Sequence, residues 1–264
     1  MAPAEPIHPP ADAATAVTWN ALRQHTAPAA FTEAVAGLLL EEVDRGRPIL
    51  DVGAGSGQLA RALTDRGASV IALDLSVPML ELVPRQLVRV AADATRLPLA
   101  AGSVGAALAA HVLHVVPAWP EAIAELDRVV GPAGVVLVQS APSSGVLGGL
   151  PELRAVYRGS LPARALVGSE VAGPDGDRVL ERAFAVVGRT AHDLPTVKAA
   201  RQETARGVIG WMQGNPWTWP GPTTDEERSA AAGATEVWAA GAGIDLDEPF
   251  ETTTLNRWRA YRRL

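Results

Sequence analysis

Cysteine is absent from the 264-residue sequence, and Lys198 is its single lysine. Without thiols the chain forms no disulfide bonds and offers no thiolate ligands to a metal ion. Long apolar runs are also missing, since no uninterrupted stretch approaches the about 20 residues that a membrane-spanning helix needs. No secretory signal is evident at the start of the sequence. We therefore predict a cytoplasmic protein with no membrane partner and no metal site.

A concentrated basic surface is missing as well. The formal net charge is −6 and the pI is about 5.4, whereas binding to nucleic-acid phosphates needs clustered cations. The most basic stretch, residues 257–263, is better explained as a final strand with a solvated edge. We predict no nucleic-acid partner. The abundance of alanine and arginine indicates a GC-rich bacterial genome and says nothing about function.

Length and composition favour one large hydrophobic core, because 48% of the 264 residues are hydrophobic. We predict a flexible tail over residues 1–14 and a single domain over residues 15–264. Within it, residues 141–190 are expected to form a helical lid insert, with helices near 150–157 and 178–187. Two helices, divided near Pro28, are expected before the first strand.

The most informative feature is a buried strand that ends in glycines. Residues 49–52 (Ile-Leu-Asp-Val) are followed by Gly53, Gly55 and Gly57, and a helix is expected to begin near Gln58. Glycines permit positive φ and carry no Cβ, so backbone amides can approach a ligand closely just before a helix N-terminus. This pattern predicts a loop that holds a nucleoside cofactor.

A carboxylate supports that interpretation. The next apolar strand, residues 69–73, ends in Asp74, about 20 residues after the first glycine. A carboxylate in this place can accept hydrogen bonds from both ribose hydroxyls and would repel a 2′-phosphate. An ordinary strand-to-helix turn explains a glycine triplet alone, but not its combination with Asp74.

Strands and helices alternate along the chain, which requires parallel crossover connections. We predict an α/β fold with a Rossmann-like, seven-stranded, mostly parallel sheet, an antiparallel final strand and the helical lid insert. The expected strands cover residues 49–52, 69–74, a short strand within 88–94 that runs into Asp93, 104–110, 134–139, 196–201 and 250–261. Parallel strands would bring the loop, Asp74, Asp93 and His111 to one edge of the sheet.

The glycine spacing separates two cofactor classes. Dinucleotide folds usually carry G-x-G-x-x-G, but Gln58 occupies the place of the last glycine, leaving G-x-G-x-G. With Asp51, this pattern resembles motif I of the class I S-adenosylmethionine-dependent methyltransferases, of the small-molecule, type 11-like kind. The resemblance continues to about Gln139 and covers roughly a third of the chain. The chain departs from many relatives by having Val104 and Gly105 at the start of the fourth strand.

The resemblance implies which residues contact S-adenosylmethionine. The loop would lie against the methionine part, Asp51 would order the loop, Asp74 would bind the ribose, and Asp93 would accept from the adenine amino group. Met79 is also explained as plain helix core, and Asp93 as the cap of a turn. The implied cofactor residues are Asp51, Gly53, Ala54, Gly55, Gly57, Asp74, Leu75, Met79, Asp93, Ala94 and Ala110.

Histidines are the candidate catalytic residues. The sulfonium already activates the methyl group, so positioning the acceptor dominates, and a base helps only where a hydroxyl must lose a proton. His111 leads because it follows the fourth strand; His114 and His192 come next. A structural role is the stronger alternative for His114.

Aromatic residues give two weaker indications. Trp19, Arg23 and His25 in the first helix are candidates for closing the cofactor pocket. Trp211, Met212, Trp217 and Trp219 form either an aromatic substrate pocket or the anchor of a proline-rich loop.

These observations predict an enzyme that transfers a methyl group to a small-molecule acceptor, with oxygen slightly favoured as the acceptor atom. Chemistry that uses a cysteine nucleophile on cytosine is excluded, and the N/D-P-P-Y/F pattern of amino-group DNA methyltransferases is missing from residues 110–113. Two alternatives stay open: a cofactor-binding protein or rearrangement catalyst without methyl transfer, and an NAD-dependent oxidoreductase. The sequence leaves the acceptor and the oligomeric state open.

Overall fold

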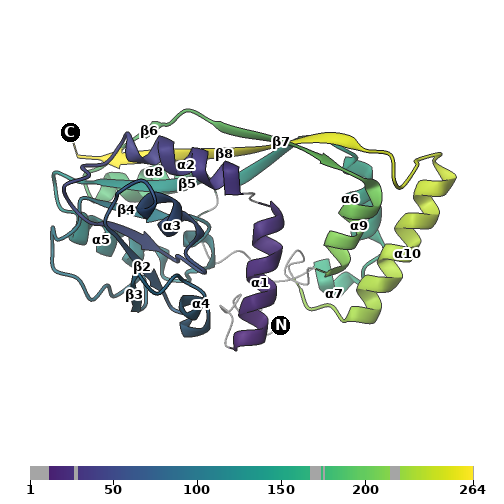
Figure 1. The fold of residues 1–264 in the computed structure, drawn as a ribbon, viewed down its shortest axis with the longest axis horizontal. Helices are drawn as coiled ribbons and strands as arrows, with labels where there is room; N and C mark the ends of the chain where they lie inside the picture. Colours follow the sequence, from purple (N-terminus) through teal and green to yellow (C-terminus); the bar gives the residue numbers. More distant parts are fainter. Residues whose placement is uncertain (1–11, 27–28, 167–173, 175, 215–220, 264) are drawn as a thin grey trace. The chain divides into compact units, whose positions relative to one another are not determined.

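The computed structural model describes residues 12–26, 29–166, 174, 176–214 and 221–263. Trp217 and Trp219 lie outside the described residues, as do the side chains of Trp19, Arg23 and His25. The elements follow in this order (Figure 1): α1 (Ala13–Thr26), α2 (Ala29–Leu40), β1 (Ile49–Val52), α3 (Gln58–Thr64), β2 (Val70–Asp74), α4 (Val77–Glu81), β3 (Val88–Ala91), β4 (Ala106–Ala109), the 3-10 helix η1 (Leu113–Val115), α5 (Trp119–Val130), β5 (Val135–Gly148), α6 (Pro151–Gly159), α7 (Ala163–Leu166), α8 (Asp177–Val186), β6 (Thr190–Asp193), β7 (Val197–Glu203), α9 (Ala205–Gly214), α10 (Asp225–Gly241) and β8 (Phe250–Arg262).

The strands form one mixed sheet in the order β3-β2-β1-β4-β5-β8-β6, with β7 pairing β8 beside this path. β1 is parallel to β2 on one side and to β4 on the other, and β4 is parallel to β5. β8 is antiparallel to β6. The chain therefore reverses its direction of winding at β1, and open α/β sheets bind ligands at the carboxyl ends of strands at such a point.

The predicted α/β, mostly parallel fold with an antiparallel final strand is confirmed, but the sheet of the described residues has eight strands rather than seven. The additional strand is β6, which pairs Thr190 with Arg262 and Asp193 with Arg259. Its four residues are mostly exposed and polar, so the sequence carries no apolar alternation that would indicate a strand there.

Two apolar layers cover the sheet. One cluster joins the sheet to α2 and α3 through side chains such as Leu39 and Leu63. The second cluster joins it to α5 and α8 through side chains such as Leu126 and Phe184. All four residues of β1 are buried, as expected for a strand covered on both faces. The glycine loop is thus attached to the best-packed part of the sheet.

Two compact units make up the chain. The described parts of residues 6–144, 171–197 and 256–264 form one, here called the sheet unit; those of 145–170 and 198–255 form the other, here called the helical unit. The expected lid insert, 141–190, overlaps the helical unit over residues 145–170. Helix α8, also expected in the insert, belongs to the sheet unit, where Phe184 stacks on Tyr261 with ring centroids 3.9 Å apart. The single domain predicted over residues 15–264 stays a prediction.

The helical unit has its own apolar core, built where α6, α9 and α10 lie side by side (Figure 1). Leu153, Tyr157 and Met212 are fully buried in it. The hydroxyl of Tyr157 donates to the carbonyl of Arg228 over 2.8 Å, which satisfies a polar group that burial would otherwise penalise. Helix α10 begins with a capping box, in which Thr224 and Glu227 exchange hydrogen bonds.

Candidate functional site

The loop between β1 and α3 has the backbone that its glycines were expected to permit. Gly53, Gly55 and Gly57 have φ of 69°, 57° and 75°, a region that side chains with a Cβ avoid. The Ala54 amide donates to the Leu73 carbonyl over 2.9 Å, which attaches the loop to the end of β2. The loop therefore turns sharply above two neighbouring strand ends.

Close packing around the loop excludes larger residues. A Cβ on Gly53 would lie 2.6 Å from Cγ2 of Val112, and one on Gly57 would lie 3.0 Å from Cγ1 of Val83. The sequence pattern did not indicate that Val112 and Val83 support the loop. Because Val112 directly follows His111, this packing holds the segment after β4 against the first glycine of the loop.

Asp74 links the loop to β2. Its Oδ2 accepts from the Gly55 amide and its Oδ1 from the Ser76 amide, each over 2.8 Å. Burial raises the pKa of Asp74, while the hydrogen bonds from the amides of Ser76, Gly55 and Leu75 act in the opposite direction. A carboxylate has about four lone-pair sites, so three amide donors leave one site for a ribose hydroxyl.

Asp51 lies beneath the loop on β1 and is 2% exposed. Burial raises the pKa of Asp51 to about 7, the charge of Asp74 adds to the rise, and a hydrogen bond from the Ala60 backbone opposes it. Asp51 therefore joins β1 to the start of α3 through Ala60, and its role in ordering the loop stays a prediction.

Two apolar residues beyond Asp74 differ in exposure. Leu75 is 59% exposed, which leaves its side chain open at the carboxyl end of β2. Met79 is 5% exposed, and its Cε lies 3.3 Å from the place that a Gly55 Cβ would take. Leu75 is thus available to an adenine ring, whereas Met79 is core that also supports the loop. The adenine contact of both residues stays a prediction.

Asp93 follows β3 and caps a turn, since its Oδ1 accepts from the amide and the hydroxyl of Thr95, each over 2.8 Å. Its exposed side chain precedes the buried Ala94. Arg128 on α5 holds the segment after this turn by donating to the carbonyls of Leu97 and Leu99 over 3.0 and 2.8 Å. Capping and adenine binding are compatible, because Oδ1 alone makes these bonds; the adenine contact remains a prediction.

His111 has an unusual backbone. Its φ is 52°, which makes it, among the described residues, the one non-glycine residue with positive φ. Such strain often accompanies a functional position. Ala110 precedes it, and the ring of His114 in η1 lies edge-on to that of His111, with centroids 6.4 Å apart. His114 is exposed. These two histidines share the edge of the sheet that carries the loop.

His192 lies elsewhere in the sheet unit. It belongs to β6, and the strands β4, β5 and β8 separate β6 from β1 in the sheet order. Its Nε2 is 3.5 Å from Oε2 of Glu42, a carboxylate that also pairs with Arg262 over 2.9 Å. The structure does not bring His192 together with the other two histidines, and its catalytic role stays a prediction.

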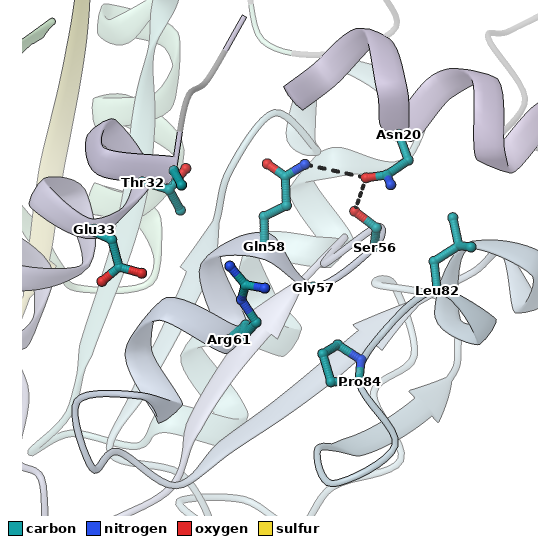
Figure 2. A pocket seen from close by; sticks show the side chains of 10 residues that line it. Asn20, Thr32, Glu33, Ser56, Gly57, Gln58, Arg61, Leu82 and Pro84 are labelled. Atoms are coloured by element: carbon teal, nitrogen blue, oxygen red, sulfur yellow. Dashed lines mark hydrogen bonds between the residues drawn. The ribbon is translucent and has the colours of Figure 1, made fainter. Parts of the chain in front are cut away.

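Asn20 on α1 is a contact that the sequence did not reveal. Its Oδ1 accepts from the Ser56 hydroxyl over 2.6 Å and from Nε2 of Gln58 over 3.3 Å (Figure 2). Gln58, which replaces the third glycine of the dinucleotide pattern, therefore uses its side chain to hold α1 beside the loop. We call this arrangement the Asn20 clasp.

A cavity of about 450 Å³ lies beside the Asn20 clasp (Figure 2). Residues of α1, α2, α3 and the end of α4 line it. Of the predicted cofactor residues, Gly57 alone contributes to its wall; the lining residues are Asn20, Ala29, Thr32, Glu33, Ser56, Gly57, Gln58, Arg61, Leu82 and Pro84. The cavity thus adjoins the outer side of the loop, and Asp74 and Asp93 are not part of its lining.

The structure also bears on the expectations about a metal site, a membrane-spanning helix and the aromatic cluster. Within the described ranges no three His, Asp or Glu side chains gather as a metal site would require. No described helix is both long and apolar enough to cross a membrane. Of the aromatic cluster, Met212 is buried core and Trp211 packs against that core. Residues 215–220 of the proline-rich loop lie outside the described residues, so both interpretations of the cluster stay open.

Comparison with known proteins gives a family match for one segment of the chain. Residues 50–138 match the model of the methyltransferase domain family. The malonyl-[acyl-carrier protein] O-methyltransferase of Pseudescherichia vulneris is 38% identical over 128 residues, which are 47% of this chain and 49% of that protein. The demethylmenaquinone methyltransferase of Renibacterium salmoninarum is 38% identical over 96 residues, 35% of this chain and 40% of that protein. The chain thus spans about half the length, or less, of these curated relatives.

A solved structure agrees with the fold. A type II methyltransferase candidate from Anaeromyxobacter dehalogenans superposes with a TM-score of 0.59 at 21% identity, covering 87% of this chain and 95% of that chain. This likeness concerns the fold alone, while the matching segment of 50–138 contains the loop, Asp74, Asp93 and His111. Residues 50–138 thus match a methyltransferase domain, and over this segment the chain is similar to S-adenosylmethionine-dependent methyltransferases.

Proposed function

We propose that this chain transfers a methyl group from S-adenosylmethionine to a small-molecule acceptor, with oxygen the favoured acceptor atom. The acceptor, its atom and a cytoplasmic location are parts of this proposal. The observation that carries it is the link between the glycine loop and Asp74, whose carboxylate accepts the Gly55 amide over 2.8 Å. That link fixes a strand-end carboxylate beside a loop in which three glycines lack a Cβ, as suits an adenosyl ligand.

The residues present fit the cofactor. Gly53, Ala54, Gly55 and Gly57 would face its methionine part, Asp74 its ribose, and Leu75 with Asp93 its adenine. When bound, S-adenosylmethionine supplies a methyl group that its sulfonium already activates. The chain must then hold the acceptor oxygen in line with the bond that breaks, and orientation of this kind accounts for much of the rate.

His111 is the residue that we propose to receive the acceptor proton. Its strained backbone holds it beside the loop through the packing of Val112 on Gly53. A neutral imidazole accepts a proton near neutral pH, so the hydroxyl proton passes to His111 as the oxygen–methyl bond forms. His114, whose ring lies edge-on to that of His111, is proposed as its neighbour in this step.

The experiment is transfer of a labelled methyl group from S-adenosylmethionine to a panel of hydroxy, carboxylate and amine compounds. Labelled product is expected with an oxygen acceptor. Tight cofactor binding without labelled product across the panel would favour a binding protein and contradict the enzyme.

A variant tests the proposed base. His111→Asn removes the imidazole while keeping a residue type that tolerates positive φ, so turnover should fall by roughly 100-fold or more with cofactor affinity retained. His114→Asn and His192→Asn, assayed beside it, separate the three candidates. Full turnover by His111→Asn would remove it from catalysis.

A further inference from the structure

The helical unit contains a cluster of charged and aromatic side chains that lies outside the proposed cofactor contacts. It comprises Arg154 on α6, Arg201 and Glu203 on β7, Trp211 on α9 and Thr252 on β8, and we call it the Arg154 cluster. Four elements of one compact unit contribute to it.

Arg154 is the cation of this cluster that no carboxylate pairs with. Its guanidinium carbon lies 5.3 Å from the centroid of the Trp211 ring, a cation–π contact. Among the described side chains no carboxylate approaches within 4.0 Å of it, and Arg154 is exposed. Desolvation lowers its pKa, while the charge of Glu203 acts in the opposite direction and that of Arg201 adds to the lowering. Arg154 is therefore a reachable, incompletely hydrated cation.

Glu203 forms its ion pair with Arg201 rather than with Arg154. Its Oε1 pairs with Nη2 of Arg201 over 2.8 Å, and its Oε2 accepts the Thr252 hydroxyl over 2.8 Å. The alternation of β7 places Arg201 and Glu203 on the same half-buried face, with side chains 19% and 11% exposed. Two arginines and one glutamate leave the cluster with one surplus positive charge.

Trp211 adds a polar group without a partner. Its indole Nε1 is buried and has no acceptor among the described residues. A buried donor that lacks an acceptor is costly, and a bound ligand that supplies the acceptor would remove that cost. The ring that supports Arg154 thus also carries an unused donor.

We propose that the Arg154 cluster binds the carboxylate of a small-molecule ligand. A guanidinium presents a planar fork of donors that matches a carboxylate. One surplus positive charge balances a monoanion, whereas the second charge of a phosphate dianion would be opposed by Glu203. The proposal concerns binding in the helical unit and does not depend on methyl transfer.

The test is calorimetric titration of the full chain with benzoate, with the isosteric neutral benzamide as a control. Benzoate should bind with a Kd in the millimolar range or below, and benzamide should not bind up to about 10 mM. Arg154→Gln should weaken benzoate binding about tenfold or more. Arg182→Gln, which removes an exposed charge from α8 in the sheet unit, should leave benzoate binding unchanged.

A second variant separates the site from a folding defect. Glu203→Gln removes the negative charge of the cluster and should tighten benzoate binding about threefold or more, a gain that misfolding does not produce. Equal binding of benzoate and benzamide, equal effects of Arg154→Gln and Arg182→Gln, or tighter binding of inorganic phosphate than of benzoate would overturn the proposal. No binding of benzoate up to about 10 mM would overturn it too.

Discussion

Two arginines, one in each unit, show how differently the sheet unit and the helical unit treat a charge. Arg189 in the sheet unit is 2% exposed and donates to Asp127 and to the carbonyls of Gly131, Gly134 and Tyr261 over 2.7–3.1 Å. Arg154 in the helical unit lies on an aromatic ring without a carboxylate partner among the described residues. The guanidinium of Arg189 is held by hydrogen bonds within the fold, whereas that of Arg154 is available to a ligand.

The same contrast extends to the binding groups. In the sheet unit the proposed contacts come from backbone amides, small residues and strand-end carboxylates, which the topology fixes. In the helical unit they are long charged side chains placed by tertiary packing. Substitutions in the first should therefore disturb folding and binding together, and those in the second should change binding with little effect on stability.

The largest effect is expected for the buried arginine. Arg189→Ala removes the donor to Oδ1 of Asp127 and to three carbonyls, although Arg263 still donates to Oδ2 of Asp127. It should lower the free energy of unfolding by about 3–5 kcal/mol. Arg154→Ala loses a cation–π contact and should cost about 0.5–1 kcal/mol. Denaturant unfolding of both variants measures the difference. Similar losses of unfolding free energy would contradict the proposed difference between the two charges.

The next effect concerns the glycine loop. Gly53→Ala places a Cβ against Val112 at positive φ, so strain and overpacking together should cost roughly 2–4 kcal/mol and abolish cofactor binding. Gly67→Ala is the matched control, because Gly67 has φ of 87° but open space around its Cβ position; it should cost about 1–2 kcal/mol and retain binding. Equal losses for the two variants would mean that the packing of Val112 is unimportant.

A pH dependence sharpens the account of Asp51. Its pKa is raised from 3.8 to about 7, so between these values the folded chain holds a proton that the unfolded chain has released. Stability from this group therefore falls as pH rises through that window. Asp51→Asn, which keeps the shape of the protonated acid, should stabilise the protein more at pH ~8 than at pH ~5. Urea unfolding at both pH values checks this, and a gain that is independent of pH would contradict it.

The smallest effect is expected at the Asn20 clasp. Asn20→Ala removes the acceptor of Ser56 and Gln58 and should weaken cofactor binding by about 0.5–1.5 kcal/mol. A double-mutant cycle with Ser56→Ala isolates the contact, because the two variants share one hydrogen bond. Additive effects in the cycle would show that the clasp does not couple α1 to the loop.

The sequence predicted those parts that short-range patterns determine. The glycine spacing, the apolar strands and the divided helices before β1 all correspond to observed elements, because each has a local physical cause. Strand β6 was missed because it is a short polar edge strand whose pairing with β8 is a long-range contact. The paired arrangement at Asn20, 36 residues from Ser56, carries no local signal either.

Catalytic positions were harder to predict than cofactor positions. Three histidines were candidates, with His111 first because it follows the fourth strand, and the sheet order separated His192 from the other two. The positive φ of His111 and the packing of Val112 depend on the folded structure, and no local sequence pattern indicates them. The Arg154 cluster could not be predicted from local patterns either, because α6, β7, α9 and β8 each contribute a residue to it.

Calorimetry with S-adenosylhomocysteine tests the central assignment most directly, using the wild type, Asp74→Ala and the control Asp65→Ala, whose side chain is 60% exposed. Binding to the wild type and to the control is expected, with a loss of about 1–3 kcal/mol in Asp74→Ala, because the ribose hydroxyls lose a charged acceptor. Unchanged affinity of Asp74→Ala, or no heat of binding in a wild-type protein that binds a nicotinamide dinucleotide instead, would contradict it.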